Sequence, residues 1–150
     1  LYPFKVDSTR KYSYNPDING QFVIRSLEGD DENTEGDYAM MHFSLEVDLP
    51  IKEKKVYVYG AFNSFQLLPE NQMIFDEKDN MYKAKFLLKQ GFYNYSFATV
   101  NTIGKLDLSE LNGTFYQTEN QYTVIVYYKR IGDFYESVIG VGTGFFNQNR

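Results

Sequence analysis

The residues of this chain that could act as acids, bases or nucleophiles are few, and their spacing does not favour catalysis. Among its 150 residues there is one histidine, His42, and no cysteine. A thiolate nucleophile and a thiolate metal site are therefore excluded, and a Ser-His-Asp arrangement would have to be built around His42 alone. His42 falls on the polar side of an alternating segment, and no adjacent residue completes such an arrangement. The sequence therefore predicts a protein that is not an enzyme and has no catalytic residues.

Carboxylates are most concentrated in the segment Glu28–Asp37, which reads EGDDENTEGD. If a calcium loop of the EF-hand type began at Asp31, it would need Asp or Asn where Glu35 stands and Glu where His42 stands. These ligands are missing, so we interpret the segment as a solvated acidic loop and expect no metal and no cofactor. The other carboxylates fall among turn residues, where a paired general acid and base cannot be assigned.

Composition and charge narrow the classes of partner. The net charge is -5 at pH 7, whereas nucleic-acid binding requires clustered Lys and Arg, so no nucleic-acid partner is expected. No apolar run approaches the ~20 residues that cross a bilayer as a helix, so no transmembrane segment is expected. The chain has 14 Tyr, 13 Phe and no Trp, and this aromatic content favours β-strands.

Alternation of apolar and polar residues predicts several short strands between turn residues, at 21–25, 40–47, 56–59, 81–88, 93–97, 122–128 and 137–146. No segment has a sustained helical period. We therefore predict an all-β, immunoglobulin-like sandwich over residues 21–150, preceded by an arm or linker at 1–20. Phe86 and Tyr95 are predicted core residues. The strand at Tyr122–Tyr128 has apolar residues on both faces and is predicted to be interior.

The motif Gly60-Ala61-Phe62-Asn63-Ser64-Phe65 and the later Gly91-Phe92-Tyr93-Asn94-Tyr95-Ser96-Phe97 resemble the early-set immunoglobulin-like domains. Within these domains they resemble the glycogen-binding carbohydrate-binding modules. The resemblance implies a structural role for Phe62 and a sugar-stacking position at Phe65. The second stacking aromatic of those modules would fall near Lys105-Leu106, where none is present. A glycan-binding module is therefore the alternative function, with weak or absent binding to α-glucan expected.

A longer resemblance covers nearly the whole chain and rests on three segments, YPFKVDSTRKYSYNPDING from Tyr2, GTFYQTENQY from Gly113 and Ile139-Gly140-Val141-Gly142. Together they are similar to the plug protein family of the type IX secretion system of Bacteroidota. In that family such a segment is the C-terminal part of a longer chain. The resemblance implies a periplasmic, outer-membrane-associated protein without catalysis. Its implied partners are an outer-membrane translocon barrel, whose periplasmic side it closes, and a preceding domain of the same chain.

Two segments are candidate partner-contact or glycan-contact sites. The first is the loop 61–68, in which Phe62 is expected to be buried beside Asn63 while Phe65 projects as the favoured contact. The second is the strand from Ile139, in which Gly140, Gly142 and Gly144 share one face. Phe145 stands where a dinucleotide-binding G-x-G-x-x-G motif would need its third glycine, so this pattern favours close packing of a backbone or a partner.

Overall fold

The structure is a computed structural model that describes residues 4–5, 18, 20–25, 36–48, 50–115 and 117–146. It divides into two compact units, residues 1–114 and residues 115–150. The described residues are almost entirely strands and connecting loops, so the predicted all-β sandwich is confirmed. No helix among them is long and apolar enough to cross a membrane.

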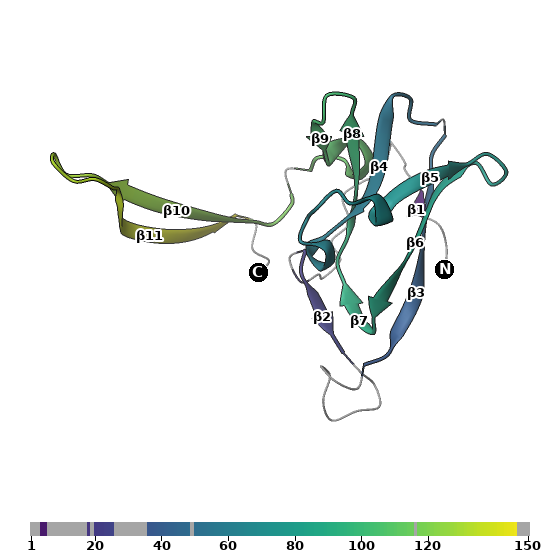
Figure 1. Cartoon of the computed structure of the whole chain (residues 1–150), viewed down its shortest axis with the longest axis horizontal. Coiled ribbons are helices and arrows are strands. Elements are labelled where there is room, and N and C mark those ends of the chain that lie inside the picture. The colour runs from purple at the N-terminus through teal and green to yellow at the C-terminus, as the bar shows by residue number, and fades with distance from the viewer. Residues whose placement is uncertain are drawn as a thin grey trace. The chain divides into compact units, whose positions relative to one another are not determined.

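The described residues of the first unit form nine strands, two short 3-10 turns and one short helix, and Figure 1 shows how the strands are arranged. They are β1 (Phe4–Lys5), β2 (Phe22–Ile24), β3 (Tyr38–Glu46), β4 (Lys54–Tyr59), η1 (Ala61–Asn63), η2 (Pro69–Asn71), β5 (Gln72–Asp76), β6 (Met81–Lys89), β7 (Gly91–Tyr93), β8 (Ser96–Asn101), β9 (Leu106–Asp107) and α2 (Ser109–Asn112). The second unit contains β10 (Asn120–Tyr128) and β11 (Ser137–Phe146).

Strand β5 links the two layers of the sandwich. The strand order is β1-β3-β6-β5-β4-β8-β9, and β2 pairs separately with β7. Gln72 and Met73 at the start of β5 pair with β4, whereas Ile74–Asp76 pair with β6. The strand therefore leaves one layer and joins the other, as strands at sandwich corners do.

The core lies between these layers and follows the predicted alternation. Its buried side chains are Phe43, Leu45, Val47, Val56, Val58, Met73, Tyr82, Phe97 and Leu111. On the polar face of β3 and β6, His42 is opposite Lys85 and Ser44 is opposite Lys83. Full burial of an aliphatic side chain such as Leu45 contributes roughly 1.5–3 kcal/mol, so this alternation stabilises the observed register.

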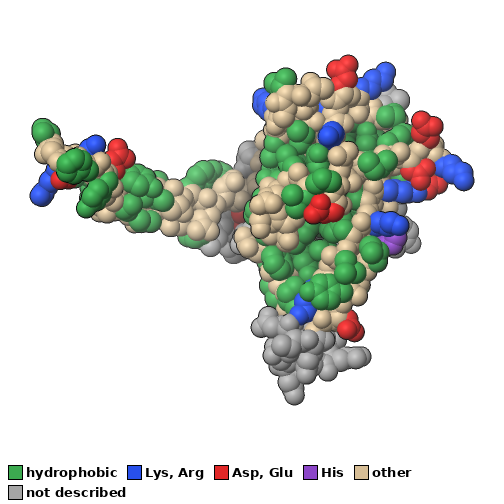
Figure 2. Space-filling model, viewed as in Figure 1, with side chains coloured by type: hydrophobic (Ala, Val, Ile, Leu, Met, Phe, Trp, Pro, Cys, Tyr) green, Lys and Arg blue, Asp and Glu red, His purple; other side chains and the backbone are tan. Residues whose placement is uncertain are grey.

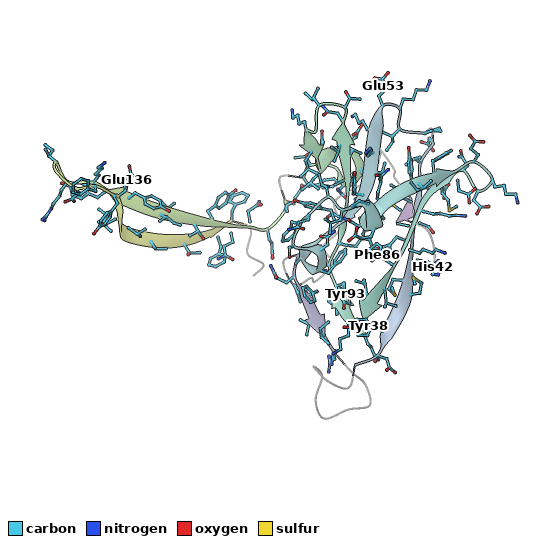
Figure 3. The ribbon with its side chains drawn as sticks, viewed as in Figure 1. Tyr38, His42, Glu53, Phe86, Tyr93 and Glu136 are labelled. Carbon is cyan, nitrogen blue, oxygen red and sulfur yellow. The ribbon has the colours of Figure 1, made fainter. Side chains whose placement is uncertain are left out.

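The prediction that Phe86 is a core residue is confirmed, whereas the same prediction for Tyr95 is wrong. Phe86 packs against the core and stacks on Phe43 at 4.7 Å between ring centroids (Figure 3). Tyr95 is 46% exposed, although its ring meets the edges of Phe43 and Phe97 and its partial burial raises the pKa of its phenol. The expected strand 93–97 is interrupted because β7 pairs with β2 while β8 pairs with β4. The face alternation is lost where the chain changes partner.

The predicted arm 1–20 is joined to the first unit at the places that the structure describes. Phe4 and Lys5 pair in parallel with Leu45 and Glu46 at the edge of β3. The N–H of Ile18 donates a hydrogen bond of 2.8 Å to Asn94 Oδ1. Most of the acidic segment 28–37, including the rejected calcium positions Asp31 and Glu35, lies outside the described residues.

The second unit is a two-stranded antiparallel hairpin. Every residue of β10 is exposed, so the prediction that Tyr122–Tyr128 is an interior strand is wrong for the described chain. The predicted sandwich extended to residue 150, whereas the structure separates the hairpin from the first unit after Thr114. Apolar residues on both faces predict a covered strand, whereas no described residue buries β10.

Candidate interaction site

The loop between β4 and β5 is built on close packing around Gly60. A Cβ atom at Gly60 would lie 2.8 Å from the Asn94 carbonyl oxygen and 2.8 Å from the Phe62 ring, so only glycine fits there. Phe62 turns inward, stacks on Phe86 at 5.7 Å and meets Tyr93 edge-on at 6.1 Å. Its position agrees with the structural role that the sequence resemblance implied, and it leaves Phe62 little surface for a partner.

Two asparagine side chains hold the backbone of this loop. Asn63 Nδ2 donates to the Val58 carbonyl at 3.3 Å. Asn71 is 2% exposed, and its Nδ2 donates to the Val58 carbonyl at 2.7 Å and to the Gln66 carbonyl at 3.1 Å. Its Oδ1 accepts a bond of 2.9 Å from the Leu68 N–H. Sequence analysis missed Asn71, because asparagine in a loop gives no signal that its side chain is buried.

Phe65 projects from this fixed loop. Its side chain is 47% exposed, and its ring lies 5.5 Å from the ring of Tyr59. Ser64 and Phe65 have φ angles of 53° and 55°, the left-handed region that a bulky residue rarely adopts. Such a conformation costs on the order of 1–3 kcal/mol and persists only where the surrounding structure imposes it. The N–H of Phe65 donates to the Gly60 carbonyl at 3.0 Å, which helps impose it.

The predicted contact residues fall in both units. Phe62, Asn63 and Phe65 share the loop of the first unit, whereas Gly140, Gly142 and Gly144 lie on β11 of the second. Of the first group, only Phe65 presents a large exposed aromatic surface. Figure 2 shows hydrophobic side chains along the hairpin, with charged side chains near its turn. The loop and the hairpin are therefore two separate candidate surfaces.

The sole histidine, His42, lies at the surface of the first unit. His42, labelled in Figure 3, borders a hollow of about 470 Å³ on the polar face of β3 and β6. Ser44, Glu70 and Lys85 also line this hollow. Lys83, which also lines the hollow, is engaged by Asp76 at 2.9 Å and by Asp79. No group of three metal-ligating side chains occurs among the described residues.

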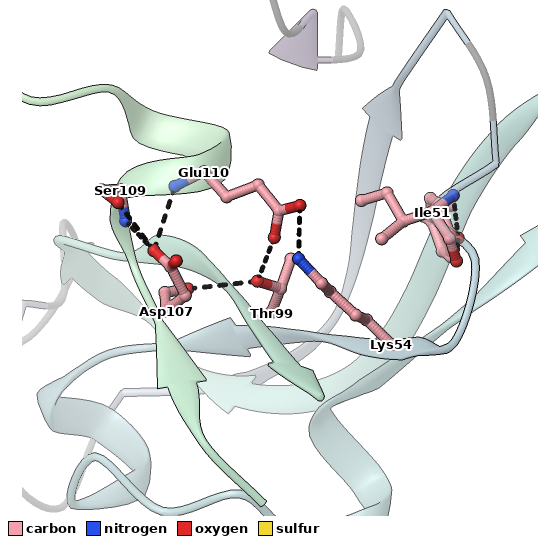
Figure 4. A network of polar contacts seen from close by, with 7 residues as sticks. Ile51, Lys54, Thr99, Asp107, Ser109 and Glu110 are labelled. Atoms are coloured by element: carbon pink, nitrogen blue, oxygen red, sulfur yellow. Dashed lines mark hydrogen bonds and ion pairs between the residues drawn. The ribbon is translucent and has the colours of Figure 1, made fainter. Parts of the chain in front are cut away.

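A polar cluster fastens helix α2 to the sheet (Figure 4). Lys54 Nζ lies 2.7 Å from Glu110 Oε1, and the buried Thr99 hydroxyl donates to Glu110 Oε2 at 2.5 Å. Asp107 Oδ1 accepts bonds from the Ser109 N–H at 2.8 Å and the Ser109 hydroxyl at 2.7 Å. The bond from Lys54, then that from Thr99, holds the pKa of Glu110 below its ordinary value. The bonds from Ser109 do the same for the pKa of Asp107.

This cluster is expected to make the first unit sensitive to acid. Because the folded pKa values of Glu110 and Asp107 lie below the ordinary 4.5 and 3.8, their contribution is present above those values. It is lost as pH falls through the lowered folded values. Urea unfolding at about pH 7 and about pH 3 should show a lower midpoint in acid. In Glu110→Gln the difference between the two midpoints should be smaller than in the wild type. An equal difference would contradict the assignment of acid sensitivity to this cluster.

Comparison with known proteins identifies a similar solved structure. No protein-family model matches this sequence, and no curated protein matches it. A crystal structure of a hypothetical protein from Parabacteroides merdae ATCC 43184, at 2.30 Å resolution, is similar with a TM-score of 0.86 and 33% sequence identity. The match covers 97% of this chain and 37% of that chain. The present chain therefore spans little more than a third of the length of this neighbour.

Proposed function

We propose that this chain is a non-catalytic interaction module, the C-terminal part of a plug protein that closes the periplasmic side of an outer-membrane secretion translocon. The observation that supports binding is Phe65, an exposed aromatic residue held in a left-handed backbone conformation. The translocon as partner rests on the sequence resemblance to the plug family. Periplasmic localisation at the outer membrane is part of the same proposal.

The loop suits reversible and specific binding. Aromatic residues dominate the binding energy of many protein interfaces because they bury a large area at a low cost in side-chain entropy. Here the Asn71 and Asn63 hydrogen bonds fix the backbone before any partner arrives. Less freedom is then lost on association, so a small contact centred on Phe65 can be effective.

Replacing Phe65 with alanine is expected to weaken the affinity for the translocon barrel roughly 30-fold, the factor that a loss of about 2 kcal/mol at a binding hot spot implies, and so to reduce recovery of the barrel. The measurement is co-purification with the tagged protein from an outer-membrane extract. Phe92→Ala is the matched control, because Phe92 is another exposed phenylalanine on the same unit, 52% exposed on β7.

If Phe65→Ala leaves recovery of the barrel unchanged, the loop is not the contact. If the wild-type protein recovers no barrel, the plug proposal fails. The exposed ring of Phe65, which lies beside the half-buried Tyr59, favours a second candidate, a glycan-binding module, because a sugar ring can stack on an aromatic surface. Retardation of the wild type, but not of Phe65→Ala, in a glycogen-containing gel would support that alternative.

A further inference from the structure

The β10–β11 hairpin exposes an unusually apolar surface. Its two strands, NQYTVIVYY and SVIGVGTGFF, contain no charged residue. The exposed large side chains on these strands are Tyr122, Val124, Ile125, Val126, Tyr127, Tyr128, Val138, Ile139, Val141, Phe145 and Phe146. Contiguous apolar surface of this kind marks interaction sites on soluble proteins. Charged side chains that would discourage association along the strand edges are missing.

The strand register gives one face of the hairpin a ridge beside a trough. Residues directly opposite each other share a face, and the register pairs Tyr122 with Gly144, Val124 with Gly142 and Val126 with Gly140. Large side chains therefore stand along β10, while bare backbone lies beside them along β11. We call this surface, made by Tyr122, Val124, Val126, Gly140, Gly142 and Gly144, the glycine face.

Nothing within the described chain requires glycine at these three positions. None of the three has a positive φ angle. A Cβ atom at Gly142 or Gly144 would meet no described atom within 4 Å, and one at Gly140 would meet only Val126, at an ordinary 3.8 Å. Gly60 and Gly91 differ, because a Cβ at Gly91 would lie 2.4 Å from the Val23 carbonyl oxygen. Glycine weakens a strand, so its repeated use here points to close approach by an outside group.

A two-stranded hairpin with so many exposed apolar side chains is expected to pack against another surface in water. A two-stranded hairpin alone is marginally stable at best and gains independent stability from a third strand or a packed layer. Among the described residues, β10 and β11 pair only with each other. The similar chain from Parabacteroides merdae contains much further polypeptide, since this chain accounts for only 37% of it.

We propose that the glycine face is a docking surface for polypeptide outside residues 1–150, belonging to the same longer protein, as the length of the neighbour suggests. The docking segment carries aromatic or long aliphatic side chains that fill the trough over Gly140, Gly142 and Gly144. The ridge of Tyr122, Val124 and Val126 packs beside them. This contact is independent of Phe65 and joins the hairpin to its own protein.

The test is hydrogen–deuterium exchange, followed by mass spectrometry, on the protein made from its complete gene and on the isolated 150-residue chain. Amides of residues 120–146 should exchange at least about tenfold more slowly in the complete protein, because docking raises the free energy of local opening. Gly142→Val should abolish that protection by filling the trough. Thr143→Val is the matched control, since Thr143 faces the opposite side and pairs with Thr123.

The outcomes separate this proposal from its alternatives. Protection in the complete protein that is lost in Gly142→Val and kept in Thr143→Val supports it. Rapid exchange in the complete protein overturns it, as does protection that survives Gly142→Val. Slow exchange in the isolated chain also overturns it, and a dependence on protein concentration would then identify a second copy as the cover. Protection that arises only with phospholipid vesicles would assign the surface to lipid instead.

Discussion

Replacing Phe43 with alanine is expected to lower the free energy of unfolding of the first unit by about 3–5 kcal/mol. Phe43 is 6% exposed and lies in the core between the two layers. Its ring stacks on Phe86 at 4.7 Å and meets Tyr95 edge-on at 5.1 Å, so truncation removes buried apolar surface and two aromatic contacts. Urea unfolding followed by circular dichroism measures the change.

Phe92→Ala is the control for this prediction, because the same side chain is removed from a position that is 52% exposed. It should change the free energy of unfolding by less than about 1 kcal/mol. A loss below about 1 kcal/mol for Phe43→Ala as well would show that the register of β3 against β6 is wrong.

Replacing Asn71 with leucine is expected to destabilise the first unit by roughly 3 kcal/mol or more. Leucine keeps a similar volume, so the cost comes from hydrogen bonding and not from a cavity. The change removes two donated bonds, to Val58 and Gln66, and one accepted bond from the Leu68 N–H. Each lost hydrogen bond costs about 0.5–1.5 kcal/mol, so the loss of three accounts for a change of this size.

Asn120→Leu provides the comparison for this second prediction. Asn120 is exposed and makes a local bond of 2.9 Å to the Thr118 carbonyl, so its replacement should leave unfolding of the first unit almost unchanged. Thermal or urea unfolding of the two variants decides the question. Equal stabilities would mean that Asn71 does not organise the loop that carries Phe65.

Alternation along the chain was sufficient to predict the parts of the fold in which one sheet face is buried. In β3, Phe43 and Leu45 face the core while His42 faces solvent, as the sequence predicted. The inward position of Phe62 was also predictable, because its Gly-x-Phe-Asn motif resembles that of related modules. These features depend on the spacing of residue types within a short segment, which can be read directly from a single sequence.

The remaining features depend on contacts between distant residues. Unbroken alternation over residues 93–97 predicts Tyr95 in the core, whereas the chain changes its pairing partner between Tyr93 and Ser96. The burial of Asn71 depends on carbonyls of Val58 and Gln66 that alternation does not reveal. Two apolar faces predict that the strand at 122–128 lies inside the sandwich, whereas every residue of β10 is exposed. The position of a strand relative to the core depends on long-range contacts, which the pattern along one strand does not give.

The most direct test of the proposed function is photo-crosslinking in living cells. A photoreactive amino acid would be placed at Phe65 in one strain and at Lys85, an exposed position on the polar sheet face, in another. We predict a crosslink between position 65 and the outer-membrane translocon barrel, and none from position 85. Absence of that crosslink at position 65, or equal crosslinking from both positions, would contradict the proposal that this loop binds the translocon.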